Sequence, residues 1–119
     1  MLNLNSIMIG TSQPKVLAEF YKKVFAKNPD MVDGDWSGWS IGNTFISIGG
    51  HSEVKGQAAE PQRLMFNFET HEVKEEFERI KKTGATVIKE PYDMGGAWIA
   101  TFADPDGNYF QLMTPWEAK

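Results

Sequence analysis

The chain of 119 residues contains no cysteine and only two histidines. Without cysteine there can be no disulfide bond, thiolate metal ligand or cysteine nucleophile. No apolar run reaches the length of about 18 residues that a membrane-spanning helix needs. The net charge of −4 and the lack of a Lys/Arg cluster argue against nucleic acid and membrane partners. Residues 1–4 lack the charged start and apolar core of a signal peptide, so a cytoplasmic protein is expected.

The composition is that of a globular protein, with 41% hydrophobic and 24% charged residues. The length suits a single domain, residues 1–119, with a hydrophobic core. In its first half, Ser12 is the expected N-cap of a helix that has Pro14 in its first turn and ends before Asn28. Apolar residues at alternating or β-rich spacing predict strands on both sides of that helix, at residues 4–10, 36–41 and 44–48.

The second half shows the same order of elements. Thr70 is the expected N-cap of a helix over residues 71–83, and Gly84 is suited to end it. Strands are predicted at residues 64–69, 86–89, 98–102 and 109–114. The chain therefore predicts an α+β fold of two βαβββ modules, the first at about residues 1–60 and the second at about 61–119.

A tight turn stands between the last two predicted strands, within residues 102–112. In the run Asp104-Pro105-Asp106-Gly107, Pro105 presets φ and Gly107 tolerates a positive φ. Asp104 and Asp106 could be viewed as a catalytic carboxylate pair. Their place in a Pro-Gly turn favours a structural role.

This stretch closely resembles the Phe-x-Asp-Pro-Asp-Gly-Asn-x-x-Glu-Leu signature of the vicinal oxygen chelate superfamily, which includes glyoxalase I, bleomycin-resistance proteins and extradiol dioxygenases. The spacing from the first strand to Phe20-Tyr21, and from the strand of the second module to Gly84, is also similar. The resemblance implies two βαβββ modules forming a curved, barrel-like mixed sheet around a cleft, with the helices on its convex side. It also implies a homodimer.

Metal-using members of the superfamily carry one ligand on the first and last strand of each module. The corresponding positions here are Ser6, Ile46 (Ser47 if the register shifts by one), Met65 and Gln111. This set suits a divalent ion poorly, because such ions prefer carboxylate, imidazole or carbonyl ligands. We therefore predict no metal, no cofactor and no catalytic residue of that kind, and solvent-facing positions for His51 and His71.

A strand has a side-chain period of two, which places Tyr109, Gln111 and Met113 on one face. The four tryptophans, Trp36, Trp39, Trp98 and Trp116, are open to two interpretations, as core or dimer contacts or as walls of a ligand cleft. The predicted pocket consists of Ser6, Met8, Ile46, Met65, Asn67, Trp98, Tyr109, Gln111 and Met113.

A pocket rich in methionine and aromatic residues with a few amide and hydroxyl groups is typical of adaptable small-molecule binding. The favoured hypothesis is a metal-free protein that binds or sequesters a small aromatic or amphipathic ligand. The alternative is a divalent-metal-dependent lyase, isomerase or dioxygenase with displaced ligands. A third hypothesis is a structural or partner-binding domain without a ligand pocket.

Overall fold

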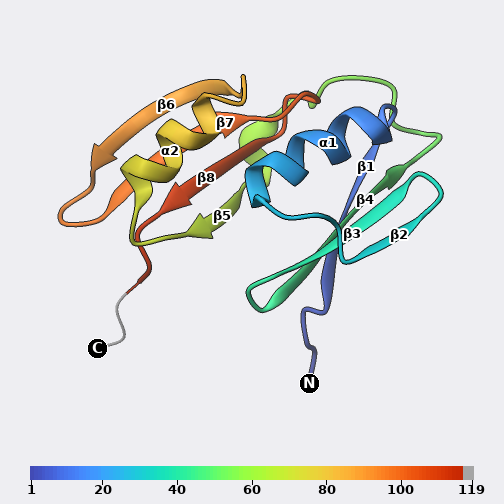
Figure 1. Ribbon diagram of the computed structural model, residues 1–119, viewed down its shortest axis with the longest axis horizontal. Coiled ribbons are helices and arrows are strands. Elements are labelled where there is room, and N and C mark those ends of the chain that lie inside the picture. The colour runs from blue at the N-terminus through green and yellow to red at the C-terminus, as the bar shows by residue number, and fades with distance from the viewer. Residues whose placement is uncertain (117–119) are drawn as a thin grey trace. The chain divides into compact units, whose positions relative to one another are not determined.

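The computed structural model describes residues 1–116 and divides into two compact units, Met1–Gly56 (module one) and Gln57–Lys119 (module two). The elements of module one are β1 (Ser6–Thr11), α1 (Pro14–Phe25), β2 (Met31–Asp33), β3 (Trp36–Ile41) and β4 (Thr44–Gly50) (Figure 1). Those of module two are the 3-10 helix η1 (Pro61–Arg63), β5 (Phe66–Glu69), α2 (Val73–Lys81), β6 (Thr86–Asp93), β7 (Trp98–Ala103) and β8 (Tyr109–Met113). The predicted α+β class and the two βαβββ modules are confirmed.

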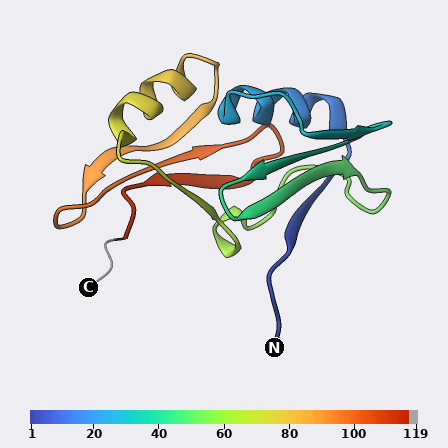
Figure 2. The ribbon, with the colours of Figure 1, turned by 60° about the horizontal axis from the view of Figure 1, so that its bottom comes forward.

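Each module has its own four-stranded mixed sheet. The strand orders are β1-β4-β3-β2 and β5-β8-β7-β6, so each module forms an open sheet of its own in place of one continuous barrel-like sheet. In each sheet the first strand pairs in parallel with the last, and the other pairs are antiparallel. Figure 2 shows each helix lying along one face of the sheet of its own module. Among residues 1–116, no helix has the length and apolar character needed to cross a membrane.

The helix of module one begins and ends slightly differently from the prediction. Gln13, rather than Ser12, is the N-cap residue of α1, and its backbone N–H donates to Thr11 Oγ1 at 3.0 Å. The helix ends before Asn28 because Ala26 adopts a left-handed conformation with φ of 56°. The short strand β2 was not predicted, because its three residues are all exposed and carry no alternation.

The core of module one fixes which face of its sheet meets α1. Trp39 is fully buried, its ring lies 5.5 Å from that of Phe25, and its Nε1–H donates to Lys27 O at 3.1 Å. Asp30 stands just beyond, where the backbone N–H of Ser40 and the ammonium of Lys27 lower the pKa of its carboxyl group. The side of the sheet that carries Trp39 is therefore the helix side.

The core of module two is an aromatic stack between α2 and its sheet. The Phe77 ring lies 5.0 Å from that of Phe102, which lies 5.6 Å from that of Phe110, and both pairs are stacked. Such aromatic pairs stabilise a core beyond the area they bury. Phe102 and Phe110 therefore mark the helix side of the second sheet.

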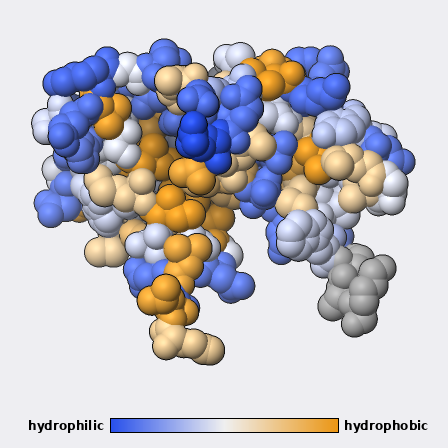
Figure 3. Space-filling model, turned by 180° about the vertical axis from the view of Figure 1, so that it is seen from behind, coloured by the Kyte–Doolittle hydropathy of each residue, from blue (hydrophilic) through white to orange (hydrophobic). Residues whose placement is uncertain are grey.

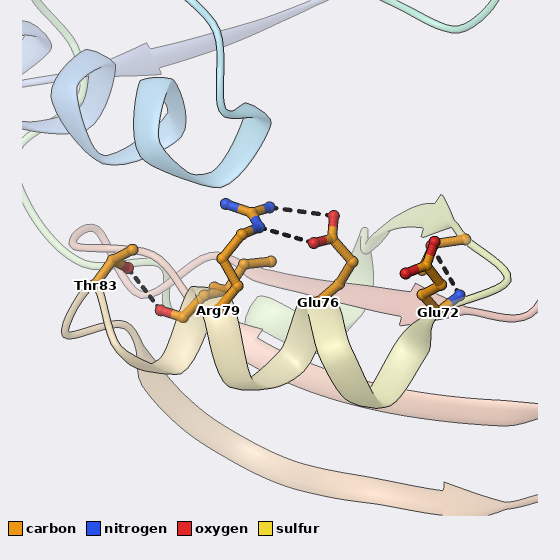
Figure 4. Close-up of polar contacts among 6 residues, drawn as sticks. Glu72, Glu76, Arg79 and Thr83 are labelled. Atoms are coloured by element: carbon orange, nitrogen blue, oxygen red, sulfur yellow. Dashed lines mark hydrogen bonds and ion pairs between the residues drawn. The ribbon is translucent and has the colours of Figure 1, made fainter.

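Helix α2 is shorter than the predicted range of 71–83. Glu72, rather than Thr70, is its N-cap residue, and the backbone N–H of Glu72 donates to Thr70 Oγ1 at 3.0 Å. On the helix surface, Arg79 Nε donates to Glu76 Oε1 at 2.8 Å, and the Thr83 hydroxyl donates to Ile80 O at 2.6 Å near the end of the helix (Figure 4). Gly84 follows with φ of 93°, a conformation that favours glycine.

Candidate functional site

The Asp-Pro-Asp-Gly turn is organised by one carboxylate. Asp104 is 5% exposed, and its Oδ1 accepts hydrogen bonds from the backbone N–H groups of Asp106 at 2.9 Å and Asn108 at 3.0 Å. The Asn108 side-chain amide donates to Asp104 Oδ2 at 3.0 Å. Gly107 has φ of 80°. These contacts give Asp104 a structural role and fix the start of β8, which carries Gln111.

The two faces of β8 differ as the period of two requires. Phe110 and Leu112 are buried on the helix side, while Tyr109, Gln111 and Met113 lie on the opposite face and are partly exposed. The parallel register with β5 places Asn67 directly beside Gln111. Four of the predicted pocket residues therefore share the face of module two that points away from α2: Asn67, Tyr109, Gln111 and Met113.

Gln111 is held by a neighbour that the sequence did not reveal. Its Nε2–H donates to Thr101 Oγ1 at 3.1 Å, and Thr101 lies opposite it in the register of β7 and β8. Thr101 is 6% exposed, so this hydroxyl is largely removed from water. With one Nε2–H engaged, Gln111 keeps its amide oxygen as a neutral acceptor and its second Nε2–H as a donor. Only the strand register, a tertiary feature, identifies Thr101 as a site residue.

In module one, Ser6 and Met8 lie on the face that points away from α1, and Met8 is opposite Ser47 in the parallel register. Ile46 does not share this face. It pairs with Trp39 on the helix side and is 3% exposed, so it belongs to the core. Ser47 instead lies on the face with Met8, where Ile46 was predicted. Ser47 is the residue that the sequence predicts for this position if the register shifts by one residue.

The same face of module one carries a pair of stacked aromatic rings. The rings of Trp36 and Phe45 are 6.0 Å apart and 27° from parallel. Both lie close to the sheet at glycines: a Cβ on Gly38 would stand 2.7 Å from Phe45 Cε2, and one on Gly49 would stand 3.1 Å from Trp36 Cδ1. Met8 Cε also approaches Gly49. We call Trp36, Phe45 and Met8, above Gly38 and Gly49, the aromatic shelf.

Gly38→Ala is expected to lower the free energy of unfolding by about 1–3 kcal/mol, the usual range for an overpacked site. The new methyl group would stand 2.7 Å from Phe45 Cε2 and 2.9 Å from Trp36 Cη2, so both rings must shift. Urea unfolding measures the loss, and near-ultraviolet circular dichroism reports the rings. Gly56→Ala is the matched control, because nothing lies within 4 Å of the added Cβ there. Equal stability of the two variants would contradict a closely packed shelf.

Two other predicted pocket residues lie elsewhere. Trp98 shares the parity of Ala100 and Phe102 on β7, which places it on the α2 side, and Lys74 Nζ lies 3.8 Å from its ring centroid. This corrects the predicted position of Trp98 in the pocket. Met65 immediately precedes β5 and is partly exposed. Of the four tryptophans, all within residues 1–116, Trp36 is the one on a sheet face that points away from a helix.

The donor chemistry does not fit the divalent metal ion that the superfamily implies. Both histidines are exposed, and His51 Nδ1 accepts a hydrogen bond from the backbone N–H of Glu53 at 3.2 Å. Over the described part of the chain, no three His, Cys, Asp or Glu side chains are grouped so that they could hold a metal. The sheet faces offer neutral donors instead: the hydroxyls of Ser6 and Ser47 and the amide oxygen of Gln111. Neutral hydroxyl and amide groups are weak ligands for a divalent ion.

Two βαβββ modules, each with a mixed sheet whose first and last strands are parallel, define the vicinal oxygen chelate superfamily, to which this chain belongs. Residues 6–113 match the model of the glyoxalase-like domain, and the protein is a member of that family. A search of curated protein sequences finds no match.

Solved structures share the fold. A glyoxalase-related enzyme from Fulvimarina pelagi has a TM-score of 0.80 at 16% identity, over 97% of this chain and 89% of that one. The fosfomycin resistance protein FosX from Mesorhizobium loti has a TM-score of 0.77 at 17% identity, over 98% and 94%. A glyoxalase/bleomycin resistance protein/dioxygenase family enzyme from Burkholderia phytofirmans has a TM-score of 0.75 at 24% identity, over 95% and 98%. At these identities the likeness concerns the fold alone.

Proposed function

We propose that this protein binds a small aromatic or amphipathic molecule without a metal ion, and that the aromatic shelf supplies the main apolar contact. The observation that carries the proposal is the stacked pair of Trp36 and Phe45, held close to the sheet above two glycines. Both rings are partly buried, which leaves part of each accessible. A flat ligand gains both buried area and ring stacking on such a surface.

The flexible thioether of Met8 and the hydroxyls of Ser6 and Ser47 complete this face. Methionine adapts to ligands of different shape, and hydroxyl groups fix a polar substituent. The neutral donors on the sheet faces support binding without a metal, because a divalent ion requires stronger ligands.

The second candidate is a divalent-metal-dependent lyase, isomerase or dioxygenase. It is considered because the family model and solved structures of the same fold include proteins whose names describe enzymes and resistance proteins. Metal analysis of protein purified without chelator separates the two candidates. One tightly bound divalent ion per chain would refute the metal-free proposal. The enzyme candidate fails if Ni, Zn, Mn and Fe(II) change neither the melting temperature nor any activity.

Tryptophan fluorescence tests the aromatic shelf. Indole-free aromatic compounds, such as 1-naphthol and benzoate, are titrated into wild-type protein, Trp36→Phe and Trp98→Phe. We expect saturable quenching in the wild type that is largely lost in Trp36→Phe and kept in Trp98→Phe, because Trp98 lies on the α2 side of its sheet under Lys74. Equal quenching in both variants would refute the shelf as the site. No response to any compound would favour a domain without a ligand pocket.

The proposal includes a homodimer and a cytoplasmic location. Support for self-association comes from the N-terminal segment, where Met1, Leu2 and Leu4 are exposed ahead of the edge strand β1. Figure 3 shows these apolar side chains projecting at the end of the chain marked N in Figure 1. Exposed apolar side chains beside an unpaired strand edge favour pairing with another chain.

A further inference from the structure

A row of four polar side chains crosses the sheet of module two on the face that points away from α2. Lys89 of β6 is opposite Thr101 of β7, Thr101 is opposite Gln111 of β8, and Gln111 is beside Asn67 of β5. Directly opposite residues point to the same face of a sheet. We call Lys89, Thr101, Gln111 and Asn67 the polar row. It combines an ammonium group, a hydroxyl and two amides at one register.

Lys89 reaches this face through an irregularity in β6. Val87 is opposite Phe102, so regular pairing would put Ile88 opposite Thr101 and turn Lys89 toward the α2 side. A register shift between Val87 and Lys89 places Lys89 opposite Thr101 instead. Bulges re-aim side chains in this way and are frequent beside functional sites.

A second register shift follows between Lys89 and Tyr92, and it brings Tyr92 opposite Ile99 on the same face. The Tyr92 ring centroid is 5.3 Å from Lys89 Nζ, within the range of a cation–π contact. The first distortion thus turns Lys89 to this face, and the second keeps Tyr92 on the same face beside it.

The charge of Lys89 is not neutralised by the protein. Within residues 1–116 it forms no ion pair with a carboxylate. The carboxylate on this face of β5, Glu69, lies at the opposite edge of the sheet, three strand spacings or about 14 Å away. Lys89, the Thr101 hydroxyl and the Gln111 amide therefore offer a charge and hydrogen-bonding groups to an anion.

We propose that the polar row recognises an anionic oxygen group, such as a carboxylate, of a small molecule that binds to this face of module two. This inference goes beyond the proposed function, because it assigns an anion-binding face to module two, separately from the aromatic shelf of module one. Lys89 supplies the charge-assisted hydrogen bond, which is shorter and stronger than one between neutral groups. Gln111 and Asn67 orient the group by donating amide N–H groups to it. Lys89 could instead protect the edge strand β6 against aggregation. In that role it would give no preference for an anionic ligand over a neutral one.

The test is a titration of 15N-labelled full-length protein with benzoate and with its neutral isostere benzamide, followed by NMR. Benzoate is expected to shift the signals of Thr101 and the Gln111 side-chain amide, and to bind about tenfold more tightly than benzamide. Lys89→Met should abolish this preference. Lys82→Met, which removes the same charge just beyond α2, should keep it. Added salt should weaken benzoate more than benzamide.

Equal affinity for the two compounds, or a preference that survives in Lys89→Met, would overturn the inference. Lys89→Met protein that aggregates but keeps the preference would assign the lysine to edge protection and also overturn it. In these cases quenching through Trp36 can persist, so the proposed ligand-binding function stands. If neither compound shifts any signal and no aromatic compound quenches Trp36, both proposals fail together.

Discussion

Phe102→Ala is expected to lower the free energy of unfolding by about 3–5 kcal/mol, the range for removing a large buried aromatic side chain. Phe102 is 0% exposed and stands between Phe77 of α2 and Phe110 of β8, with ring centroids 5.0 Å and 5.6 Å away. Its removal leaves a cavity and breaks two stacked pairs. Because a domain of this size has a total stability of only about 5–15 kcal/mol, the loss is a large fraction of it.

Urea unfolding followed by circular dichroism measures this change. Trp116→Ala is the control, because Trp116 is 85% exposed and its truncation should alter stability by less than about 0.5 kcal/mol. If Phe102→Ala does not fold, the milder variant Phe102→Leu is measured instead. Its free energy of unfolding should be lower than that of the wild type by about 1–2 kcal/mol. A loss no larger than that of Trp116→Ala would show that this stack does not support the core.

The order of elements could be predicted from the sequence because each element leaves a local pattern. The helices show their apolar faces at helical spacing. In residues 109–113 the period of two predicted that Phe110 and Leu112 share one face, and that face is the buried one. The turn before them could be predicted from Pro105 and Gly107, because proline fixes φ and glycine tolerates a positive φ in any context. The family resemblance supported the prediction of two βαβββ modules.

The candidate site could be predicted only in part, because it depends on register. A slip of one residue moves a side chain to the other face of a sheet. This is why Ile46 lies in the core while Ser47 lies with Met8. Lys89 shows the same sensitivity: a single bulge in β6 decides its face, and no local pattern marks that bulge.

The aromatic residues illustrate a second limit. Composition shows that tryptophan is abundant, but not which ring can meet a ligand. Trp36 and Trp39 are three residues apart on one strand and therefore lie on opposite faces, one on the aromatic shelf and one in the core. Phe45 completes the shelf only because Gly38, on the neighbouring strand, has no side chain. Cross-strand relations of this kind become visible only in the folded chain.

Asp104→Ala is expected to lower the free energy of unfolding by about 2–4 kcal/mol, because hydrogen bonds to a charged group contribute more than neutral ones and buried donors without partners are costly. The substitution leaves the N–H groups of Asp106 and Asn108 without the carboxylate that they share. Asp104→Asn should also be destabilising, since Asn108 Nδ2 faces both carboxylate oxygens, at 3.3 Å and 3.0 Å, and would meet a second amide.

Urea unfolding measures the loss, with Asp93→Ala as the matched control. Asp93 is also a turn carboxylate, and its Oδ1 accepts a hydrogen bond from the backbone N–H of Gly96 at 2.7 Å, but the contact is exposed. Its removal should cost less than about 1 kcal/mol, because water replaces the lost partner. If the turn also positions β8, Asp104→Ala will shift the NMR signals of Thr101 and Gln111, whereas Asp93→Ala will leave them unchanged. Equal losses in the two variants would contradict a specific role for the buried carboxylate, and the superfamily signature would then mark no more than an ordinary surface turn.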